Sequence, residues 1–390
     1  MENSFTNFEP KKCTLCNSEQ YKVLLNIDGK VLRTNNSIIK SKLKKLECSR
    51  CGLVRNGINW NEKSLKKYYQ KDYDEHIKSN ENSVFVTQTG LLERSMVVAN
   101  WIEKILKPHS NNFSSIIEIG CGSGSLMSNM SKKFPKVNFI GIESNPSAIK
   151  MGKKKGLDIR SIDTLKKAQA DVVISYAVIE HTPNPTKFLH FISSLVKDNG
   201  LILVGQPHQD KLSSDIFYQD HIFHFSTDHI REFGRNSNLV QIKKYYGTKT
   251  LSNFSFHIFK KSKKQLSPTK FQFHKTNVKK SIKYYDKIFK KVDQLLEKNR
   301  NKKLGIFGTN LFFHIFYTYT KLNSVDIKLG IDDFPSGKKF PFKIISSNDF
   351  NPKMVDKILF CANPLYFEFI KNKMSLNSNY FLNPFPTNFR

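Results

Sequence analysis

The chain has 390 residues, and its 63 Lys and Arg against 33 Asp and Glu give it a formal net charge of +30. Hydrophobic residues make up 39% of the sequence and charged residues 25%. This balance is typical of folded globular proteins and excludes a disordered or collagen-like chain. At roughly 150 residues per domain, the length predicts two or three domains. The charge favours an anionic partner, such as a nucleotide, a nucleic acid or an acidic surface.

The sequence predicts neither an export signal nor a membrane span. Residues 1–12 are polar and lack the apolar stretch of a secretory signal. The stretch Leu304–Thr320 is apolar but is interrupted by glycines and polar residues, and it is shorter than the ~20 residues that a span needs. We expect a buried strand followed by a helix there. Because six cysteines are too few for a disulfide scaffold, we expect a cytoplasmic protein.

Two Cys-x-x-Cys pairs lie near the N-terminus. Cys13 and Cys16 are separated from Cys48 and Cys51 by 31 residues. Two such pairs can place four thiolates tetrahedrally around Zn²⁺ and leave no open coordination position. We therefore predict a structural zinc module over residues 1–60. The alternative is two separate redox motifs, although neither pair begins a helix of a thioredoxin-like unit.

Residues 61–110 are predicted to form a helical segment on the substrate side of the protein. One helix is expected over Ser64–Tyr69. A second is expected over Gly90–Leu106, where apolar residues recur at helical spacing. Pro108 follows the second helix and would end it.

Residues 111–259 alternate short apolar strands with helices. The expected strands have the sequences SSIIEIG, VNFIGIE, DVVISYAV and GLILVGQ. The expected helices lie at Ser125–Lys133, Pro146–Lys155 and Thr186–Val196. Such alternation predicts an α/β fold with a mainly parallel sheet that is covered on both faces.

Residues 260–302 are strongly basic and include apolar residues at helical spacing, namely Ile282, Tyr285, Phe289, Val292 and Leu296. This stripe predicts an amphipathic linker helix. We interpret the basic residues as its solvated face, with a nucleic-acid or membrane patch as the alternative. Residues 303–390 again alternate strands and helices and predict a small C-terminal α/β domain.

The first strand of the core ends in a glycine loop, in which Glu118 is followed by Gly120, Gly122 and Gly124 and then by a helix. Glycines let the backbone turn sharply and approach a ligand closely. The next strand ends in Glu143, where a carboxylate can accept hydrogen bonds from ribose hydroxyls. The pattern resembles the class I S-adenosylmethionine-dependent methyltransferases, whereas dehydrogenases usually have G-x-G-x-x-G. The resemblance implies a Rossmann-like fold and S-adenosylmethionine as the cofactor.

This resemblance continues along the core. In that superfamily an acid after the third strand commonly meets the adenine amino group, and Asp163 is the best match. The sequence DVVISYAVIEHTPNP resembles the fourth strand and its loop, with His181 at a position that is common in the superfamily. We include His181 among the candidate catalytic residues, but expect a hydrogen-bonded, positional role for it.

The order of zinc module, methyltransferase core and small α/β tail resembles the sugar C-methyltransferase family over nearly the whole chain. These enzymes methylate the carbon beside a ketone in nucleotide-linked 4-keto-deoxysugars. The most specific element is Phe217–Ser226, FYQDHIFHFS, where the family has Tyr-x-Glu-His followed by Phe-Ser and where Asp220 replaces the Glu. The family's His-Gly-Gly-Ser is absent from 247–257, and Thr309–Phe313 replaces its Ala-Lys-Gly turn, which leaves the sugar and the role of the tail open.

The resemblance implies roles for four residues. His221 would be the base that removes a proton α to a carbonyl, a task that suits a group with a pKa near neutrality. Asp220 would orient its imidazole or act as an alternative base. Tyr218 would donate a hydrogen bond to the enolate oxygen or to the substrate. Tyr73 lies where the family carries a tyrosine near the site.

Three other functions stay open from the sequence. One is O- or N-methylation of another small molecule, and another is a binding protein that has lost turnover. The third is an RNA methyltransferase in which the zinc module and the positive charge dock nucleic acid. Because no RNA-binding module motif is present, a nucleotide-sugar substrate is favoured over nucleic acid. The sequence gives no prediction of oligomeric state.

Overall fold

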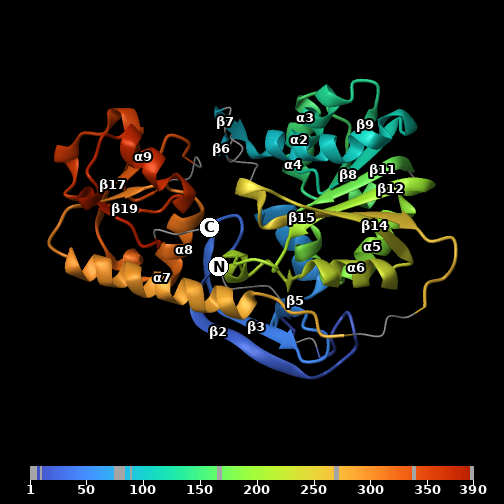
Figure 1. The fold of residues 1–390 in the computed structure, drawn as a ribbon, viewed down its shortest axis with the longest axis horizontal. Helices are drawn as coiled ribbons and strands as arrows, with labels where there is room; N and C mark the ends of the chain where they lie inside the picture. The colour runs from blue at the N-terminus through green and yellow to red at the C-terminus, as the bar shows by residue number, and fades with distance from the viewer. Residues whose placement is uncertain are drawn as a thin grey trace.

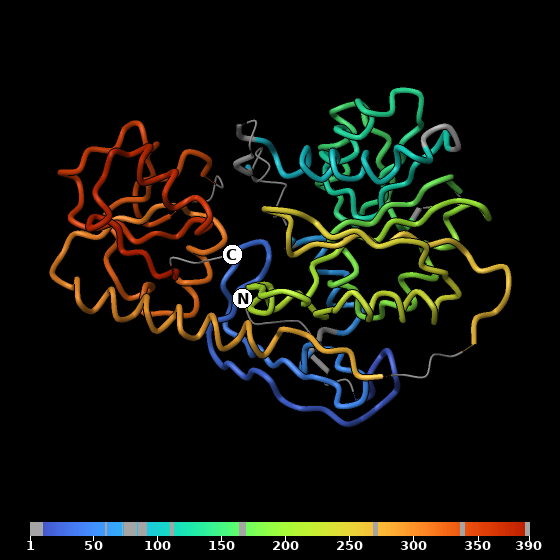
Figure 2. The backbone as a smooth tube through the Cα atoms, in the orientation of Figure 1, coloured from blue at the N-terminus to red at the C-terminus, as the bar shows by residue number. Residues whose placement is uncertain are grey.

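The structure, a computed structural model, describes residues 7–8, 11–73, 84–87, 90–164, 169–267, 272–335 and 340–386. It has three regions, which Figures 1 and 2 distinguish by colour. A β-rich N-terminal module lies beneath a central α/β region, and a C-terminal α/β domain lies to one side of both. The long helix α7 (Val278–Lys298) runs along the lower edge of the C-terminal domain towards the N-terminal module.

The N-terminal module is built on a four-stranded antiparallel sheet in the order β13-β4-β3-β2. Its strands are β2 (Tyr21–Leu32), β3 (Ile38–Cys48), β4 (Val54–Asn56) and β13 (Phe223–His224). Its edge strand β13 comes from far along the chain, since Phe223 pairs with Arg55 and His224 pairs with Val54. The segment around His221 therefore leads directly into the sheet of the cysteine-bearing module. In addition, β1 (Asn7–Phe8) pairs antiparallel with β5 (Asn59–Trp60).

The connection to the central region mixes helix and strand. Helix α1 (Glu62–Lys67) continues as a π-helical turn over Tyr68–Asp72. The strands β6 (Val84–Thr87) and β7 (Gly90–Glu93) form an antiparallel pair, and α2 (Arg94–Leu106) follows. The predicted helix over Gly90–Leu106 is therefore wrong at its first four residues, because pairing with β6 outweighs their helical spacing.

The central sheet has seven strands in the order β10-β9-β8-β11-β12-β15-β14. These are β8 (Ser115–Ile119), β9 (Asn138–Glu143), β10 (Ile159–Ser161), β11 (Ala170–Tyr176), β12 (Val196–Pro207), β14 (Leu239–Tyr246) and β15 (Phe254–Lys261). The first five in spatial order run parallel, and β15 is antiparallel to both of its neighbours. This mainly parallel, mixed sheet is that of the class I methyltransferases, and it confirms the expected fold class.

Helices cover both faces of this sheet, with α2 and α3 (Ser125–Lys133) above it and α5 (Pro185–Ser194) and α6 (Thr227–Asn236) below it in Figure 1. Successive residues of a strand point to opposite faces. Accordingly, Ile116 joins the apolar cluster of α2 and α3, while Ile117 joins that of α5 and α6. Both layers of the core are thus specified by continuous apolar strands.

Two helices of the central region begin at an Asn-Pro pair, in which Asn is the N-cap and Pro is the first helical residue. At α4 (Pro146–Lys154), the side chain of Asn145 accepts hydrogen bonds from the N–H groups of Ser147 and Ala148. Asn184 caps α5 in the same way through the N–H of Lys187. An N-cap asparagine satisfies donors that the helix leaves unpaired, and proline suits the first helical position. These pairs fix where the chain turns from strand to helix.

The C-terminal domain has a five-stranded parallel sheet in the order β18-β17-β16-β19-β20. Its elements are β16 (Leu304–Phe307), α8 (Leu311–Tyr319), β17 (Ile327–Ile331), β18 (Lys343–Ile345), β19 (Lys357–Phe360), α9 (Phe367–Lys373) and β20 (Phe381–Leu382). The apolar stretch Leu304–Thr320 thus forms a buried strand and a helix, as expected. None of the helices among the described residues combines the length and apolar character that crossing a membrane requires.

The three regions meet around Tyr319. Its hydroxyl donates to the carbonyl of Phe217 at 2.6 Å and accepts from the N–H of Leu32 at 3.2 Å. Leu32 and Phe217 belong to one apolar cluster with residues of the C-terminal domain. The apolar face of α7 packs into this cluster through the buried side chains of Tyr285 and Val292. Short segments of 3₁₀ helix connect the elements at Lys107–Asn112, Ile162–Thr164, Ile179–His181, Asp215–Phe217, Lys249–Leu251, Lys321–Ser324, Ser347–Asp349, Pro352–Met354, Pro364–Tyr366 and Ser378–Tyr380.

Candidate active site

The glycine loop leaves the carboxyl end of β8, at the edge of the sheet where ligands of open α/β folds bind. Gly120, Gly122 and Gly124 have φ values of 70°, 55° and 80°, which lie in the left-handed region that favours glycine. A Cβ on Gly120 would lie 2.5 Å from Cγ2 of Val178, so the loop touches the turn that follows β11. A Cβ on Gly122 would meet nothing within 4 Å among the described residues. The backbone at Gly122 thus faces open space, which a closely packed ligand can fill.

Glu118 is buried at the end of β8, beside this loop. Burial, together with the negative charge of Glu143, raises the pKa of Glu118 to about 8. Within the described part of the chain, its Oε2 atom is buried and has no hydrogen-bond partner. A buried polar atom without a partner is costly, and a donor such as the amino group of S-adenosylmethionine would satisfy it. The residues present therefore fit this cofactor.

Glu143 ends β9 and Asp163 follows β10, both at the same edge of the sheet. The carboxylate of Glu143 accepts hydrogen bonds from the N–H of Gly122 at 2.8 Å and from the N–H groups of Ser144 and Asn145 at 2.7 and 2.9 Å. Oε1 also accepts from the hydroxyl of Ser144 at 3.2 Å, whereas Oε2 accepts the bond from Gly122 and keeps a lone pair that can accept from a ribose hydroxyl. Asp163 is exposed, and its carboxylate accepts from the side chains of Lys66 at 2.8 Å and Gln70 at 3.2 Å. Its role towards adenine stays a prediction.

The carboxylate that faces His221 belongs to Asp215, which the sequence analysis missed. Oδ2 of Asp215 lies 3.3 Å from Nδ1 of His221 and 3.2 Å from Nδ1 of His224, while Gln209 donates to Oδ1 at 2.7 Å. Because a carboxylate only accepts, Nδ1 of each neutral imidazole carries the proton and Nε2 carries the lone pair. The signal in the sequence was a single Asp six residues before His221 and nine before His224.

The surroundings shift the pKa values of His221 and His224 in opposite directions. Burial disfavours a charge on His221, but the hydrogen bond and the negative charge of Asp215 outweigh burial and raise its pKa. Burial and the positive charge of Lys45 instead lower the pKa of His224 to about 4. Burial acts against the Asp215 carboxylate too, yet the two histidines hold its pKa well below the usual range. His221 is therefore the histidine of this group whose basicity is strengthened.

Asp220 does not occupy the position predicted for it as the partner of His221. Its carboxylate accepts from the backbone N–H of Thr34 at 2.9 Å, from the hydroxyl of Thr34 at 2.5 Å and from the hydroxyl of Tyr68 at 3.2 Å. The side chain thus turns towards the N-terminal module and the π-helical turn. The hydrogen-bonded partner of His221 is Asp215, so the prediction that Asp220 orients the imidazole is corrected.

The turn after β11 joins the glycine loop to His221. Nδ1 of His181 donates to the carbonyl of Asp220 at 2.9 Å, and its ring lies edge-on to the ring of His221 with centroids 4.7 Å apart. The neighbouring Glu180 is buried, and burial raises its pKa to about 7. Since Gly120 contacts this same turn at Val178, the glycine loop and His221 are both in contact with Val178–His181.

The two predicted tyrosines also lie in this neighbourhood. The ring of Tyr218 lies 5.4 Å from the ring of His221, measured between centroids. Tyr73 packs against Tyr69 at 5.1 Å, and Tyr69 in turn lies 5.8 Å from His181. Asn145, beside Glu143, donates to the carbonyls of both Tyr69 and Tyr73. The segment Tyr69–Tyr73 thus contacts Asn145 on the glycine-loop side of the site and His181 on the histidine side.

The four N-terminal cysteines form one buried cluster, Cys13, Cys16, Cys48 and Cys51, whose sulfur atoms all lie within 4.8 Å of one another. The Sγ atoms of Cys13 and Cys51 are 3.7 Å apart, and those of Cys16 and Cys48 are 3.5 Å apart. Tetrahedral zinc with bonds of about 2.3 Å needs separations of about 3.8 Å. A disulfide needs about 2.0 Å. The cluster therefore fits a zinc ion.

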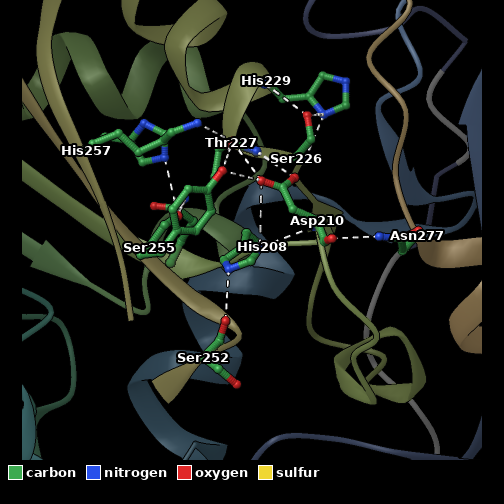
Figure 3. Close-up of polar contacts among 12 residues, drawn as sticks. His208, Asp210, Ser226, Thr227, His229, Ser252, Ser255, His257 and Asn277 are labelled. Atoms are coloured by element: carbon green, nitrogen blue, oxygen red, sulfur yellow. Dashed lines mark hydrogen bonds and ion pairs between the residues drawn. The ribbon is translucent and has the colours of Figure 1, made fainter. Parts of the chain in front are cut away.

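A second polar network surrounds the start of α6 (Figure 3), and its member His229 reaches the cysteine module. His229 on α6 donates through Nε2 to the carbonyl of Cys51 at 2.9 Å, and Ser226 caps the same helix. Asp210 accepts from Thr227 at 2.8 Å, and its carbonyl accepts from the side chain of Asn277 at 2.7 Å. This network holds the start of α6 and the start of α7 together, and it contains none of the predicted site residues.

Comparison with known proteins identifies the central region. A family model described as "Methyltransferase domain" matches residues 92–244. The matched range contains the glycine loop and the two carboxylates, so the match identifies this region as a methyltransferase domain. Among curated proteins, none is significantly similar to the chain in sequence.

Solved structures with a partial likeness to the chain are also methyltransferases. An S-adenosylmethionine-dependent methyltransferase from Clostridium acetobutylicum is 13% identical, with a TM-score of 0.36 over 43% of this chain and 92% of that one. The plantazolicin methyltransferase BpumL in complex with S-adenosylhomocysteine is 14% identical, with a TM-score of 0.38 over 50% and 94%. The mitomycin 7-O-methyltransferase MmcR is 13% identical, with a TM-score of 0.35 over 42% and 56%.

We expect Gly122→Ala to weaken S-adenosylmethionine binding about tenfold or more, because its Cβ would fill the space above the loop. Calorimetric titration with the cofactor measures the affinity. Gly156→Ala is the matched control, since Gly156 also has a left-handed φ, of 78°, and open space around it, but lies after α4. Equal affinities in the two variants would contradict a binding role for the loop.

We expect the purified chain to carry one zinc ion and the double variant Cys48→Ser/Cys51→Ser to lose it. Loss of the metal should lower the melting temperature by about 5 °C or more, since metal binding contributes to folding. Elemental analysis and thermal unfolding measure both effects. Cys361→Ser, which replaces a buried cysteine outside the cluster, should keep the zinc. Zinc retained by the double variant would disprove the site.

Proposed function

We propose that the chain methylates a carbon atom beside the ketone of a nucleotide-linked 4-keto-deoxysugar, with His221 as the base. The observation that carries this proposal is the buried Asp215–His221 pair, 3.3 Å apart, beside the turn that contacts the glycine loop. A carbon atom is a poor nucleophile until a proton α to a carbonyl is removed. A histidine whose basicity a carboxylate strengthens suits that removal.

The chemistry divides into two steps on the sugar. Nε2 of His221 takes the α-proton, and the electrons of the broken C–H bond form an enolate whose oxygen can accept a hydrogen bond from Tyr218. When bound, S-adenosylmethionine supplies an electrophilic methyl group on its sulfonium centre. The enolate carbon then forms a bond to that methyl group as the sulfur–carbon bond breaks. His221 retains the proton as an imidazolium, which Asp215 stabilises.

The zinc ion is proposed to have a structural role. All four cysteines of the cluster are buried, and a site with four thiolates leaves no position open for a substrate. We therefore assign the chemistry to the histidines and carboxylates around His221.

The test supplies radiolabelled S-adenosylmethionine and dTDP-4-keto-6-deoxyglucose, with total RNA as the competing substrate. We expect label on the sugar and loss of that label, by about 1,000-fold or more, in His221→Asn. His190→Asn is the matched control, because His190 is exposed on α5, away from the site. Label on RNA, or full turnover by His221→Asn, would contradict the proposal.

The pH profile should report the pKa of His221. Because Asp215 raises this pKa, the apparent pKa of the acid limb of kcat/KM should be higher than the ordinary histidine value of about 6.5. Asp215→Asn removes the negative charge, so the limb should move to lower pH while the maximal rate falls about 100-fold or more. Rates measured between pH 5 and 9 check both effects. An unmoved limb would show that Asp215 does not set the basicity of the essential group.

A further inference from the structure

The segment 218–222, which carries His221, belongs to no helix or strand. Its five backbone carbonyls nevertheless all accept hydrogen bonds from elsewhere in the chain. In order, the donors are Lys45 Nζ at 3.0 Å, Asn56 Nδ2 at 2.7 Å, His181 Nδ1 at 2.9 Å, Lys45 Nζ at 3.1 Å and the N–H of Asn56 at 2.8 Å. Four of the five bonds thus come from two residues of the N-terminal module.

Lys45 and Asn56 form a single unit. They are register partners across the antiparallel strands β3 and β4, and Nζ of Lys45 donates to Oδ1 of Asn56 at 2.7 Å. The ammonium group therefore uses its three donors on one amide oxygen and two carbonyls of the 218–222 segment. Each polar atom of the Asn56 side chain also has a partner, since Oδ1 accepts from Lys45 and Nδ2 donates to Gln219.

Burying the Lys45 side chain costs free energy, and packing alone does not explain why a lysine occupies this position. Lys45 is fully buried, and moving an ammonium group out of water is expensive unless its hydrogen bonds are replaced. Burial lowers its pKa to about 7, while the negative charges of Asp215 and Asp220 act in the opposite direction. An apolar residue would fill the same space without that penalty, but it would leave two carbonyls beside His221 without this donor.

We propose that Lys45 and Asn56 are positioning residues that hold the 218–222 segment and thereby fix the imidazole of His221 against Asp215. This inference rests on the proposed role of His221 as the base. The unit comes from the strands on either side of the Cys48–Cys51 loop, so the cysteine module acts as the support of the catalytic segment. Neither residue needs to touch the substrate.

Small displacements of a base have large kinetic consequences. Misplacement of a reacting group by about 1 Å can cost about 100-fold in rate. The cofactor would still bind in variants of the unit, because the glycine loop and Glu143 lie on other strands. Loss of the unit should therefore lower kcat more than it changes the affinity for S-adenosylmethionine.

The experiment compares the full chain with Lys45→Met, which keeps an apolar stem of similar length and removes the donors. We expect kcat to fall about 10- to 100-fold, with the affinity for S-adenosylmethionine within about threefold of the original value. Hydrogen exchange followed by mass spectrometry should show faster exchange in peptides over 218–222 and unchanged protection in β8 and β11. Lys42→Met is the matched control, since Lys42 lies on the same strand with a side chain that is 41% exposed, and it should match the original protein in each measurement.

If Lys45→Met loses its protection from hydrogen exchange along the whole chain, that variant has not folded, and Asn56→Asp serves as the second test. This variant keeps an oxygen for Lys45 but removes the donor to Gln219, and it should speed exchange in 218–222 and lower kcat. Unchanged exchange and unchanged kcat in a folded variant would overturn the proposal. The exchange measurement needs no substrate. Faster exchange in 218–222 therefore supports the role of Lys45 and Asn56 even if the original protein does not methylate the sugar. Failure to methylate the sugar would refute only the proposed substrate.

Discussion

When a carboxylate and an imidazole are both buried, each loses its hydrogen bonds to water. Their burial is tolerated if they form a hydrogen bond with each other. Asp215 and His221 meet this condition with a separation of 3.3 Å, and Gln209 satisfies the second oxygen of the carboxylate. Burying either group alone would leave an unpaired polar group at a high cost in stability. The pair also strengthens the basicity of His221, so the same contact that makes the burial tolerable prepares a proton acceptor.

The rest of the site follows from where the two partners sit. Asp215 begins a 3₁₀ turn, whereas His221 lies in a segment without regular structure. A backbone of that kind keeps its shape only if its polar groups find partners elsewhere. The N-terminal sheet supplies them through Lys45 and Asn56, and the turn after β11 supplies one through His181. The cysteine cluster holds Cys48, at the end of β3, beside Cys51, which precedes β4, and so joins the two strands that carry this support.

Much of this arrangement could be predicted from the sequence because it depends on local patterns. The alternation of apolar strands and helices predicted the central fold, and the glycine spacing together with Glu118 and Glu143 predicted the cofactor edge of the sheet. The spacing of the cysteine pairs predicted the buried cluster. Each of these signals lies within one or two neighbouring elements, where periodicity and turn chemistry determine the structure.

The contacts that the sequence did not yield are those that join distant segments. Asp220 was favoured as the partner of His221 because it stands where the family's motif has a Glu, but its carboxylate turns to Thr34 and Tyr68. Asp215 reaches His221 only because the chain folds back through a 3₁₀ turn. Nothing in the sequence distinguishes Lys45 from the other lysines, and its contacts with the carbonyls of Tyr218 and His221 arise only in the folded chain. The first four residues of the predicted helix at Gly90 likewise formed a strand because they pair with β6.

The central claim is that the methyl group becomes bonded to carbon. The most direct measurement is the ¹³C NMR spectrum of the product formed from dTDP-4-keto-6-deoxyglucose and S-adenosylmethionine labelled with ¹³C in its methyl group, with the reaction run in D₂O. The account predicts a labelled methyl signal in the aliphatic C–CH₃ range, together with deuterium at the α-position of unreacted sugar. A labelled methyl signal in the O–CH₃ or N–CH₃ range, with no deuterium at the α-carbon, would contradict it.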